Sequence, residues 1–226
     1  MKVVLLCGGL GTRIREETEF RPKPMVEIGG RPILWHIMKY YAHFGLRDFV
    51  LCLGYRGAVI KDYFLNYEAM NNDFTISLGN KNQIWFHGDH SERDFNVTLA
   101  ETGLETMTGG RLKRVARYLN DSETFLLTYG DGLSDVNLHD LMAYHNEHGK
   151  LATVTVVNPP TRYGLPQMDG DRRVVRFAEK PVASDWVSAG YFVLNRKVLD
   201  YIDDDQTPFE LAPMEKLARE GELMAY

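Results

Sequence analysis

Short apolar runs alternate with amphipathic segments in the first half of the 226-residue chain, and this alternation restricts the possible folds most. Val3–Cys7, Asp48–Gly54 and Thr124–Tyr129 are short and mainly apolar, as buried strands are. Between the first two, Ile33–Phe44 places apolar residues at helical spacing, and Gly45 follows as a helix stop. Buried strands joined by helices predict an α/β fold built on a parallel sheet with right-handed crossovers.

The remaining patterns predict further elements of both kinds. The expected helices are Ala58–Met70, Arg111–Leu119, Asn137–His148, Val198–Asp203 and Phe209–Glu220. The expected strands are Gln83–His87, Asn96–Glu101, Leu151–Val157, Val174–Ala178, Trp186–Leu194 and Glu222–Tyr226. Apart from the strand Gln83–His87, residues 71–95 are polar and show no helix or strand periodicity, so we expect an excursion from the main fold. A chain that stops on the first residues of a strand is expected to be cut short.

The composition is that of an ordinary globular protein, with 44% hydrophobic and 25% charged residues. It fits one domain over residues 1–226. The formal net charge of −5 argues against a nucleic-acid binder, so any polyanion would need a local basic cluster. No apolar run is long enough to span a membrane, and the N-terminus has no signal-peptide pattern. Cys7 and Cys52 lie in apolar runs, which indicates reduced thiols in a cytoplasmic protein.

A glycine-rich segment follows the first expected strand directly. Gly8, Gly9 and Gly11 occupy three of four positions, where the absence of a Cβ lets the backbone turn sharply and approach a ligand. Thr12 and Arg13 come next. Bare N–H groups beside cationic side chains suit phosphates, so a phosphate-binding loop is one interpretation. An ordinary glycine turn between a strand and a helix is the other.

Two better-known phosphate loops do not fit this segment. The dinucleotide fingerprint needs a third glycine where this chain has Ile14, which argues against a dehydrogenase. A P-loop needs Gly-Lys-Ser or Gly-Lys-Thr, and no such tripeptide follows the glycines. Pro22 and Pro24 disfavour an immediate helix, so the loop is long, and long loops are often functional. Lys23 between these prolines is either a phosphate clamp or a solvated lysine.

Asp131 follows a buried strand between two glycines, at the end of a strand where ligands of open α/β sheets bind. It is either a magnesium ligand or part of an Asp-Gly turn. Arg111 would lie in the first turn of its expected helix, where a cation opposes the helix dipole, and this mismatch hints at a ligand. His145 and His148 share a helix face without a third ligand and are expected at the surface.

Several of these segments together resemble a known family. Gly8–Arg13, followed by Pro22–Met25, is similar to the signature of sugar-phosphate nucleotidyltransferases. Within that family, Lys23–Gly30, Met107–Arg114 and Thr128–Gly132 resemble the glucose-1-phosphate cytidylyltransferase branch. The resemblance covers nearly the whole chain, and Met107–Arg114 is the segment that points to cytidylyl transfer.

The resemblance implies transfer of a cytidylyl group from CTP to α-D-glucose 1-phosphate, which yields CDP-glucose and pyrophosphate with Mg²⁺ as cofactor. It implies a Rossmann-like, mixed and mainly parallel sheet with flanking helices, as in GT-A-like nucleotidyltransferases. Residues 1–135 would form the nucleotide-binding part, and residues 136–226 the sugar-phosphate-binding part, truncated at its C-terminus. We also expect a homo-oligomer that has neither nucleic acid nor a membrane as a partner.

The resemblance also implies roles for individual residues. Catalysis falls to Arg13, Lys23 and Asp131, and Asp131 ligates the metal. The nucleotide would be bound by Leu6, Gly8, Gly9, Leu10, Gly11, Thr12, Arg13, Thr106, Arg111 and Gly130, with Thr106 and Arg111 near its base. The sugar phosphate would be bound by Arg162, Gly164, Glu179, Lys180, Ser188 and Gly190.

The chain departs from the family pattern in two places. The family usually has Asn-Gly-Gly where this chain has Ser188-Ala189-Gly190, which removes an amide from an expected sugar contact. The family also carries a second metal-binding Asp in a segment beyond residue 226. Two alternatives therefore stay open: the same transfer with another nucleotide or sugar 1-phosphate, and a catalytically silent nucleotide-binding regulatory domain.

Overall fold

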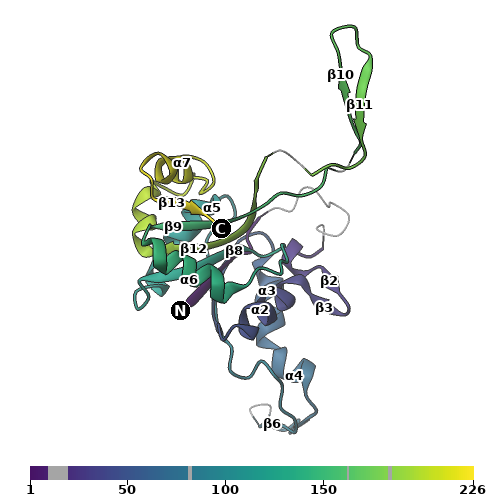
Figure 1. Cartoon of the computed structure of the whole chain (residues 1–226). Helices are drawn as coiled ribbons and strands as arrows, with labels where there is room; N and C mark the ends of the chain where they lie inside the picture. Colours follow the sequence, from purple (N-terminus) through teal and green to yellow (C-terminus); the bar gives the residue numbers. More distant parts are fainter. Residues whose placement is uncertain (10–19, 81–82, 162, 183–184) are drawn as a thin grey trace.

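A seven-stranded sheet forms the centre of the protein, in the strand order β13-β9-β12-β8-β1-β4-β7 (Figure 1). The computed structural model describes residues 1–9, 20–80, 83–161, 163–182 and 185–226. The strands of this sheet are β1 (Lys2–Leu6), β4 (Asp48–Leu53), β7 (Asn96–Glu101), β8 (Thr124–Tyr129), β9 (Ala152–Val157), β12 (Val187–Asn195) and β13 (Leu223–Ala225). β1 pairs in parallel with β4 and β8, and β4 with β7, whereas β12 is antiparallel to β8 and β9. The predicted mixed, mainly parallel α/β sheet is confirmed.

Helices cover both faces of this sheet. They are α2 (Ile33–His43), α3 (Gly57–Leu65), α4 (Tyr67–Asn71), α5 (Thr108–Arg114), α6 (Leu138–His148) and α7 (Ala212–Arg219), with 3-10 turns η1 (Lys23–Met25), η2 (Ala116–Tyr118) and η3 (Arg196–Tyr201). Neighbouring strand residues point to opposite faces, so Val4 packs under α5 and α7 while Val3 and Leu5 pack under α2 and α6. No helix among the described residues is both long and apolar enough to cross a membrane.

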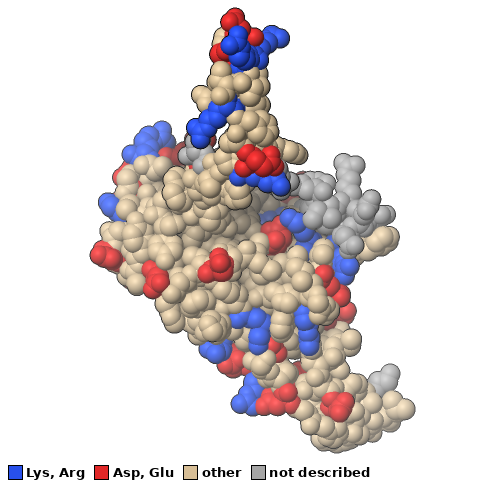
Figure 2. All heavy atoms as spheres, turned by 45° about the vertical axis from the view of Figure 1, so that its right-hand side comes forward, with Lys and Arg blue, Asp and Glu red and all other residues tan. Residues whose placement is uncertain are grey.

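Three two-stranded antiparallel sheets lie outside the central one. They are formed by β2 (Glu27–Ile28) with β3 (Arg31–Pro32), β5 (Phe74–Ile76) with β6 (Ile84–Phe86), and β10 (Leu165–Met168) with β11 (Val174–Ala178). The polar excursion therefore contains two strands where the sequence predicted one. The β10–β11 hairpin projects from the body of the protein (Figure 1). Figure 2 shows charged side chains at its tip, where residues 169–173 join the strands.

Several predicted helices have different bounds in the structure. The helix predicted over Phe209–Glu220 is the shorter α7, and the one predicted over Val198–Asp203 is the 3-10 turn η3. The helix predicted over Ala58–Met70 is divided at Asn66 into α3 and α4. The helix predicted to begin at Arg111 begins at Thr108, so Arg111 lies in its last turn, where a cation is favourable. The dipole argument for a ligand at Arg111 was therefore wrong. Gly110 lies inside this helix. A Cβ there would be only 2.5 Å from the Cα of Asp205, so the close packing of the helix against Asp205 requires glycine.

His145 is another correction to the sequence-based expectation. Its side chain lies on α6 but is buried, at 4% exposure, rather than at the surface. Its Nδ1 is 2.8 Å from Thr153 Oγ1 on β9, and His148 Nε2 is 2.7 Å from the same oxygen. The two histidines thus attach α6 to the sheet through one threonine hydroxyl.

We expect the stability of the protein to decrease as the pH falls from 6.5 toward 4, because of His145. Burial, with a smaller effect of nearby His148, lowers the pKa of His145 from 6.5 to about 4. Between these values the unfolded chain binds a proton that the folded chain does not, so acid favours unfolding. The measurement is Tm against pH for the wild type and His145→Gln, with exposed His139→Gln as the control. An acid slope that persists unchanged in His145→Gln would contradict this assignment.

Candidate active site

A cleft of about 620 Å³ opens at the carboxyl ends of β1 and β8. Its lining residues are Leu6, Cys7, Gly8, Gly9, Lys23, Pro24, Thr106, Met107, Thr108, Arg111, Tyr129, Asp131 and Glu210. Ligands of open α/β sheets bind beyond the carboxyl ends of the strands, so the cleft is where the topology places a site. The structure thus brings together seven residues that the sequence singled out, namely Leu6, Gly8, Gly9, Lys23, Thr106, Arg111 and Asp131.

An ion pair joins two of the predicted catalytic residues. The ammonium group of Lys23, on η1, contacts the carboxylate of Asp131, and each side chain is about 30% exposed to solvent. Gly130 allows this approach, because a Cβ there would lie 2.9 Å from both Cys7 Sγ and Pro24 Cγ. Its N–H donates to the carbonyl of Leu6 at 2.9 Å, which fixes the turn after β8 against the end of β1. One cation and one anion therefore face the cleft at a fixed position.

Arg111 reaches from α5 to the ends of three parallel strands. Its guanidinium donates to protein oxygens that follow or end β1, β4 and β7: Gly8 O (3.0 Å), Leu53 O (3.1 Å), Thr102 Oγ1 (2.8 Å), Gly103 O (2.8 Å) and Leu104 O (3.2 Å). The residue is only 4% exposed, and burial lowers the pKa of its guanidinium below the usual value. Arg111 therefore holds the floor of the cleft, and its expected contact with a base stays a prediction.

The two described glycines of the glycine-rich segment serve different purposes. Neither Gly8 nor Gly9 has a positive φ, so no left-handed conformation requires glycine at these positions. A Cβ on Gly8 would overlap the guanidinium of Arg111, whereas a Cβ on Gly9 would meet no atom of the described residues within 4 Å. Gly8 is thus needed for close packing against Arg111. Leu10, Gly11, Thr12 and Arg13 lie outside the described residues.

Glu210 is a lining residue that the sequence did not reveal. Its carboxylate accepts hydrogen bonds from Tyr129 Oη and Thr108 Oγ1, both at 2.5 Å. These partners come from β8 and from the first residue of α5, so the contacts join three distant segments. No motif marks Glu210, and only its spatial neighbours show that it belongs to the cleft.

Asp131 is the residue of the cleft that fits a divalent cation. Among the described residues, no group of three or more His, Cys, Asp or Glu side chains is arranged to hold a metal. Magnesium is commonly held by one or two carboxylates, with phosphate and water oxygens as its other ligands. The carboxylate of Asp131, beside the glycine backbone and Lys23, therefore fits magnesium that arrives with a nucleotide.

The residues expected to bind the sugar phosphate lie apart from the lining of this cleft. Glu179 and Lys180 follow β11, are exposed, and form an ion pair at 4.0 Å. Gly164 lies against Glu179, since a Cβ there would be 2.9 Å from Glu179 Oε2, and Ser188 Oγ accepts from the N–H of Gly190 at 3.2 Å. Gly190 packs on the ring of a cleft residue, Tyr129, whereas Arg162 lies outside the described residues. Their roles in sugar binding stay predictions.

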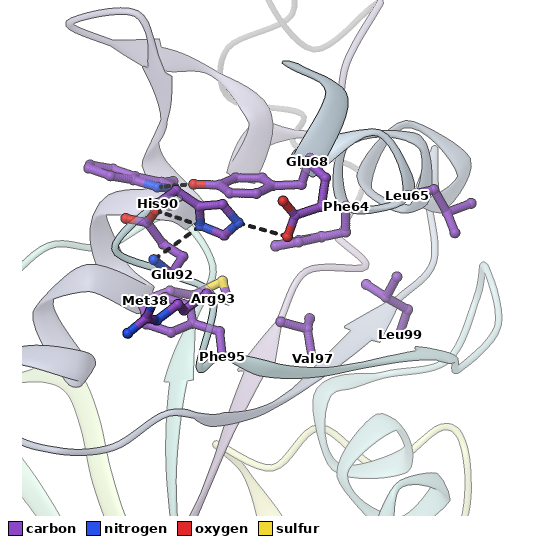
Figure 3. A pocket seen from close by; sticks show the side chains of 12 residues that line it. Met38, Phe64, Leu65, Glu68, His90, Glu92, Arg93, Phe95, Val97 and Leu99 are labelled. Atoms are coloured by element: carbon purple, nitrogen blue, oxygen red, sulfur yellow. Dashed lines mark hydrogen bonds and ion pairs between the residues drawn. The ribbon is translucent and has the colours of Figure 1, made fainter. Parts of the chain in front are cut away.

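A second cavity, of about 340 Å³, lies beside α2, α4 and β7 (Figure 3). Most of its lining is apolar, and Figure 3 shows His90 directed toward both Glu68 and Glu92. His90 Nε2 is 2.8 Å from Glu68 Oε1, and His90 Nδ1 is 3.4 Å from Glu92 Oε2. The cationic lining residue Arg93 is paired with Asp89. The described residues that line this second cavity include no glycine backbone at a strand end, whereas the cleft at β1 and β8 has Gly8 and Gly9, so that cleft is the candidate active site.

A glycine-lined cleft at the strand ends of a mixed α/β sheet is typical of enzymes that handle nucleotides. A family model described as nucleotidyl transferase matches residues 2–225. The chain therefore belongs to the nucleotidyl transferase family, which confirms the resemblance seen in its motifs.

Curated relatives narrow the comparison. The chain is 50% identical over 227 residues to glucose-1-phosphate cytidylyltransferase of Salmonella typhi, an alignment that covers all of this chain and 87% of that protein. It is 44% identical, with the same coverage, to a probable glucose-1-phosphate cytidylyltransferase of Bacillus subtilis (strain 168). Identity to mannose-1-phosphate guanyltransferase of Aspergillus oryzae is 30%, over 58% of that protein. The cytidylyl branch of the resemblance is thus also supported.

Solved structures confirm the fold. HddC from Yersinia pseudotuberculosis aligns with a TM-score of 0.67 at 23% identity, covering 100% of this chain and 89% of that one. A UDP-glucose pyrophosphorylase complexed with UDP-glucose aligns with a TM-score of 0.67 at 15% identity, with the same coverage. At these identities the likeness concerns the fold alone.

We expect Gly8→Ala to destabilise the protein by about 1–3 kcal/mol, because the added methyl group displaces the buried Arg111 guanidinium. The matched control is Gly9→Ala, whose Cβ meets no atom within 4 Å in the part of the chain that the structure describes. This variant should change the free energy of unfolding by less than about 0.5 kcal/mol. Urea denaturation of both ligand-free variants provides the measurement. Equal stability of the two variants would show that Gly8 does not pack against Arg111 in this way.

Proposed function

We propose that the chain is a glucose-1-phosphate cytidylyltransferase, which makes CDP-glucose and pyrophosphate from CTP and α-D-glucose 1-phosphate. The observation that carries this proposal is the 50% identity along the entire chain to a protein of that name. The cleft supports it, because Lys23 and Asp131 face a glycine-lined space at the strand ends. These groups suit a ligand that combines phosphates with a divalent cation.

The proposed reaction is an in-line displacement at the α-phosphorus of CTP. A phosphate oxygen of the sugar phosphate forms a bond to that phosphorus, and the bond to the bridging oxygen breaks as pyrophosphate leaves with the electron pair. The attacking oxygen is already ionised at neutral pH, so the reaction needs no general base. It needs two anions held in line and their charges neutralised.

The residues of this chain would divide that task. The N–H groups at Gly8 and Gly9 would face the nucleotide phosphates. Lys23 and Arg13 would neutralise the leaving pyrophosphate, and Lys180 the attacking phosphate. Asp131 would hold magnesium, which when bound supplies further neutralisation of phosphate charge.

The organisation of the protein is part of the same proposal. Residues 1–135 would bind the nucleotide, and residues 136–226 the sugar phosphate. A homo-oligomer is supported by two hairpins that expose apolar side chains, among them Trp85 on β6 and Phe177 on β11. Both cysteines are buried and unpaired, which suits the reducing cytoplasm.

We expect Lys23→Ala and Asp131→Ala each to lower turnover at least about a hundredfold, because each removes a charge that faces the reacting phosphates. Pyrophosphate release at saturating CTP and glucose 1-phosphate, with magnesium, is the measurement. Lys61→Ala is the control, since Lys61 pairs with Glu101 at 2.6 Å outside the lining of the cleft. Near-normal turnover in a folded Lys23→Ala or Asp131→Ala variant would remove that residue from the scheme.

A panel of nucleotides and sugar 1-phosphates tests the function itself. The proposal predicts that CTP with glucose 1-phosphate gives the fastest pyrophosphate release, and that chelation of magnesium abolishes it. Faster release with another pair would favour the same transfer on different substrates. Binding of CTP without any release would favour a silent regulatory domain.

A further inference from the structure

Glu210 presents a carboxylate to a cleft whose other charged groups suit phosphates. The residue lies in the turn before α7, and its neighbour Phe209 is fully buried against Phe192. The N–H of Phe209 donates to Thr108 Oγ1 at 2.8 Å, and Thr108 Oγ1 in turn donates to Glu210 Oε2. A hydroxyl group has only one hydrogen to donate, so these two bonds fix its direction. The carboxylate is therefore held in place on this side.

The second partner of Glu210 is equally constrained. Tyr129 Oη donates to Glu210 Oε1, and burial followed by this hydrogen bond raises the pKa of Tyr129 well above its usual value. The ring of Tyr129 packs on Gly190, where a Cβ would be 2.8 Å from the ring, and edge-on to Phe192. The phenol thus stays protonated and stationary. Both oxygens of Glu210 are consequently oriented before any ligand arrives.

The chemistry of this carboxylate limits what it can face. An ionised carboxylate only accepts hydrogen bonds, and each of its oxygens keeps a free lone pair after the bond from Tyr129 or Thr108. A phosphate has no proton to give and would be repelled. The part of a ligand beside Glu210 is therefore not a bare phosphate, and a part that carries O–H or N–H donors suits it.

The two partners also place Glu210 along the nucleotide. Tyr129 precedes Asp131, the phosphate-side residue, by two positions, and Thr108 follows Thr106, the expected base-side residue, by two. Glu210 thus contacts both the segment that carries Asp131 and the segment that carries Thr106. In every nucleotide the group between phosphates and base is the sugar ring.

We propose that Glu210 recognises the ribose of the bound nucleotide by accepting hydrogen bonds from its 2′- and 3′-hydroxyl groups, and so selects CTP over 2′-deoxy-CTP. The inference rests on the proposed function, since it assumes that a nucleotide fills the cleft. Two adjacent hydroxyl groups match the two oriented oxygens of one carboxylate. The negative charge strengthens both hydrogen bonds.

Steady-state pyrophosphate release with CTP and with 2′-deoxy-CTP tests this assignment. The wild type should prefer CTP by about tenfold or more in kcat/KM, since a site built to bond a hydroxyl group rejects an analogue that lacks it. In Glu210→Ala, kcat/KM for CTP should fall about tenfold, mainly through KM, while that for 2′-deoxy-CTP should change less. Glu210→Gln keeps one uncharged acceptor and should retain part of the preference. The control is Glu215→Ala, an exposed glutamate on α7 away from the cleft lining.

Each contrary outcome has a distinct meaning. Equal losses for both nucleotides in Glu210→Ala, or a wild type that does not distinguish them, would overturn ribose recognition. A change in CTP-to-UTP preference alone would assign Glu210 to the base and overturn it as well. If the wild type releases no pyrophosphate, the proposed function fails, and calorimetric binding of CMP against 2′-deoxy-CMP then tests Glu210 independently.

Discussion

The buried guanidinium of Arg111 is the interaction on which the candidate site depends. Burying a charge is costly unless it is well hydrogen-bonded, and Arg111 forms five hydrogen bonds to oxygens at the ends of β1, β4 and β7. All five acceptors are uncharged, so the cation is balanced by carbonyl and hydroxyl dipoles. The ends of three parallel strands are thereby joined, and the backbone at Gly8 is fixed where a ligand would meet it.

The charged groups of the cleft differ from one end to the other, as the phosphate and sugar parts of a nucleotide do. Lys23 and Asp131 lie where η1 meets the end of β8, which suits phosphates and their cation. Glu210 lies toward α5, where its carboxylate suits the uncharged, hydroxyl-bearing part of the same molecule. Lys23 and Asp131 would neutralise the phosphate charge, and Glu210 would recognise the uncharged part of the ligand. One ligand that spans the cleft would therefore contact residues that are far apart in the sequence.

Local patterns were sufficient for most of the fold and less so for the site. The strands Asn96–Glu101 and Thr124–Tyr129 have the bounds predicted, because each is a short run rich in strand-forming residues with clear ends. α5 was misplaced because its glycines disfavour a helix locally, and only packing against residues 205–207 explains them. Glu210 could not be predicted, since its partners are 81 and 102 residues away in the chain. His145 was misplaced because its burial depends on β9, which lies outside its own helix.

A crystal structure of the protein with CTP and Mg²⁺ would show where the nucleotide binds. We expect the triphosphate against Gly8 and Gly9, the metal on Asp131, and Arg111 still bonded to the carbonyl of Gly8. Nucleotide density in the cavity beside Trp35 and His90, with the cleft at β1 and β8 empty, would contradict this placement.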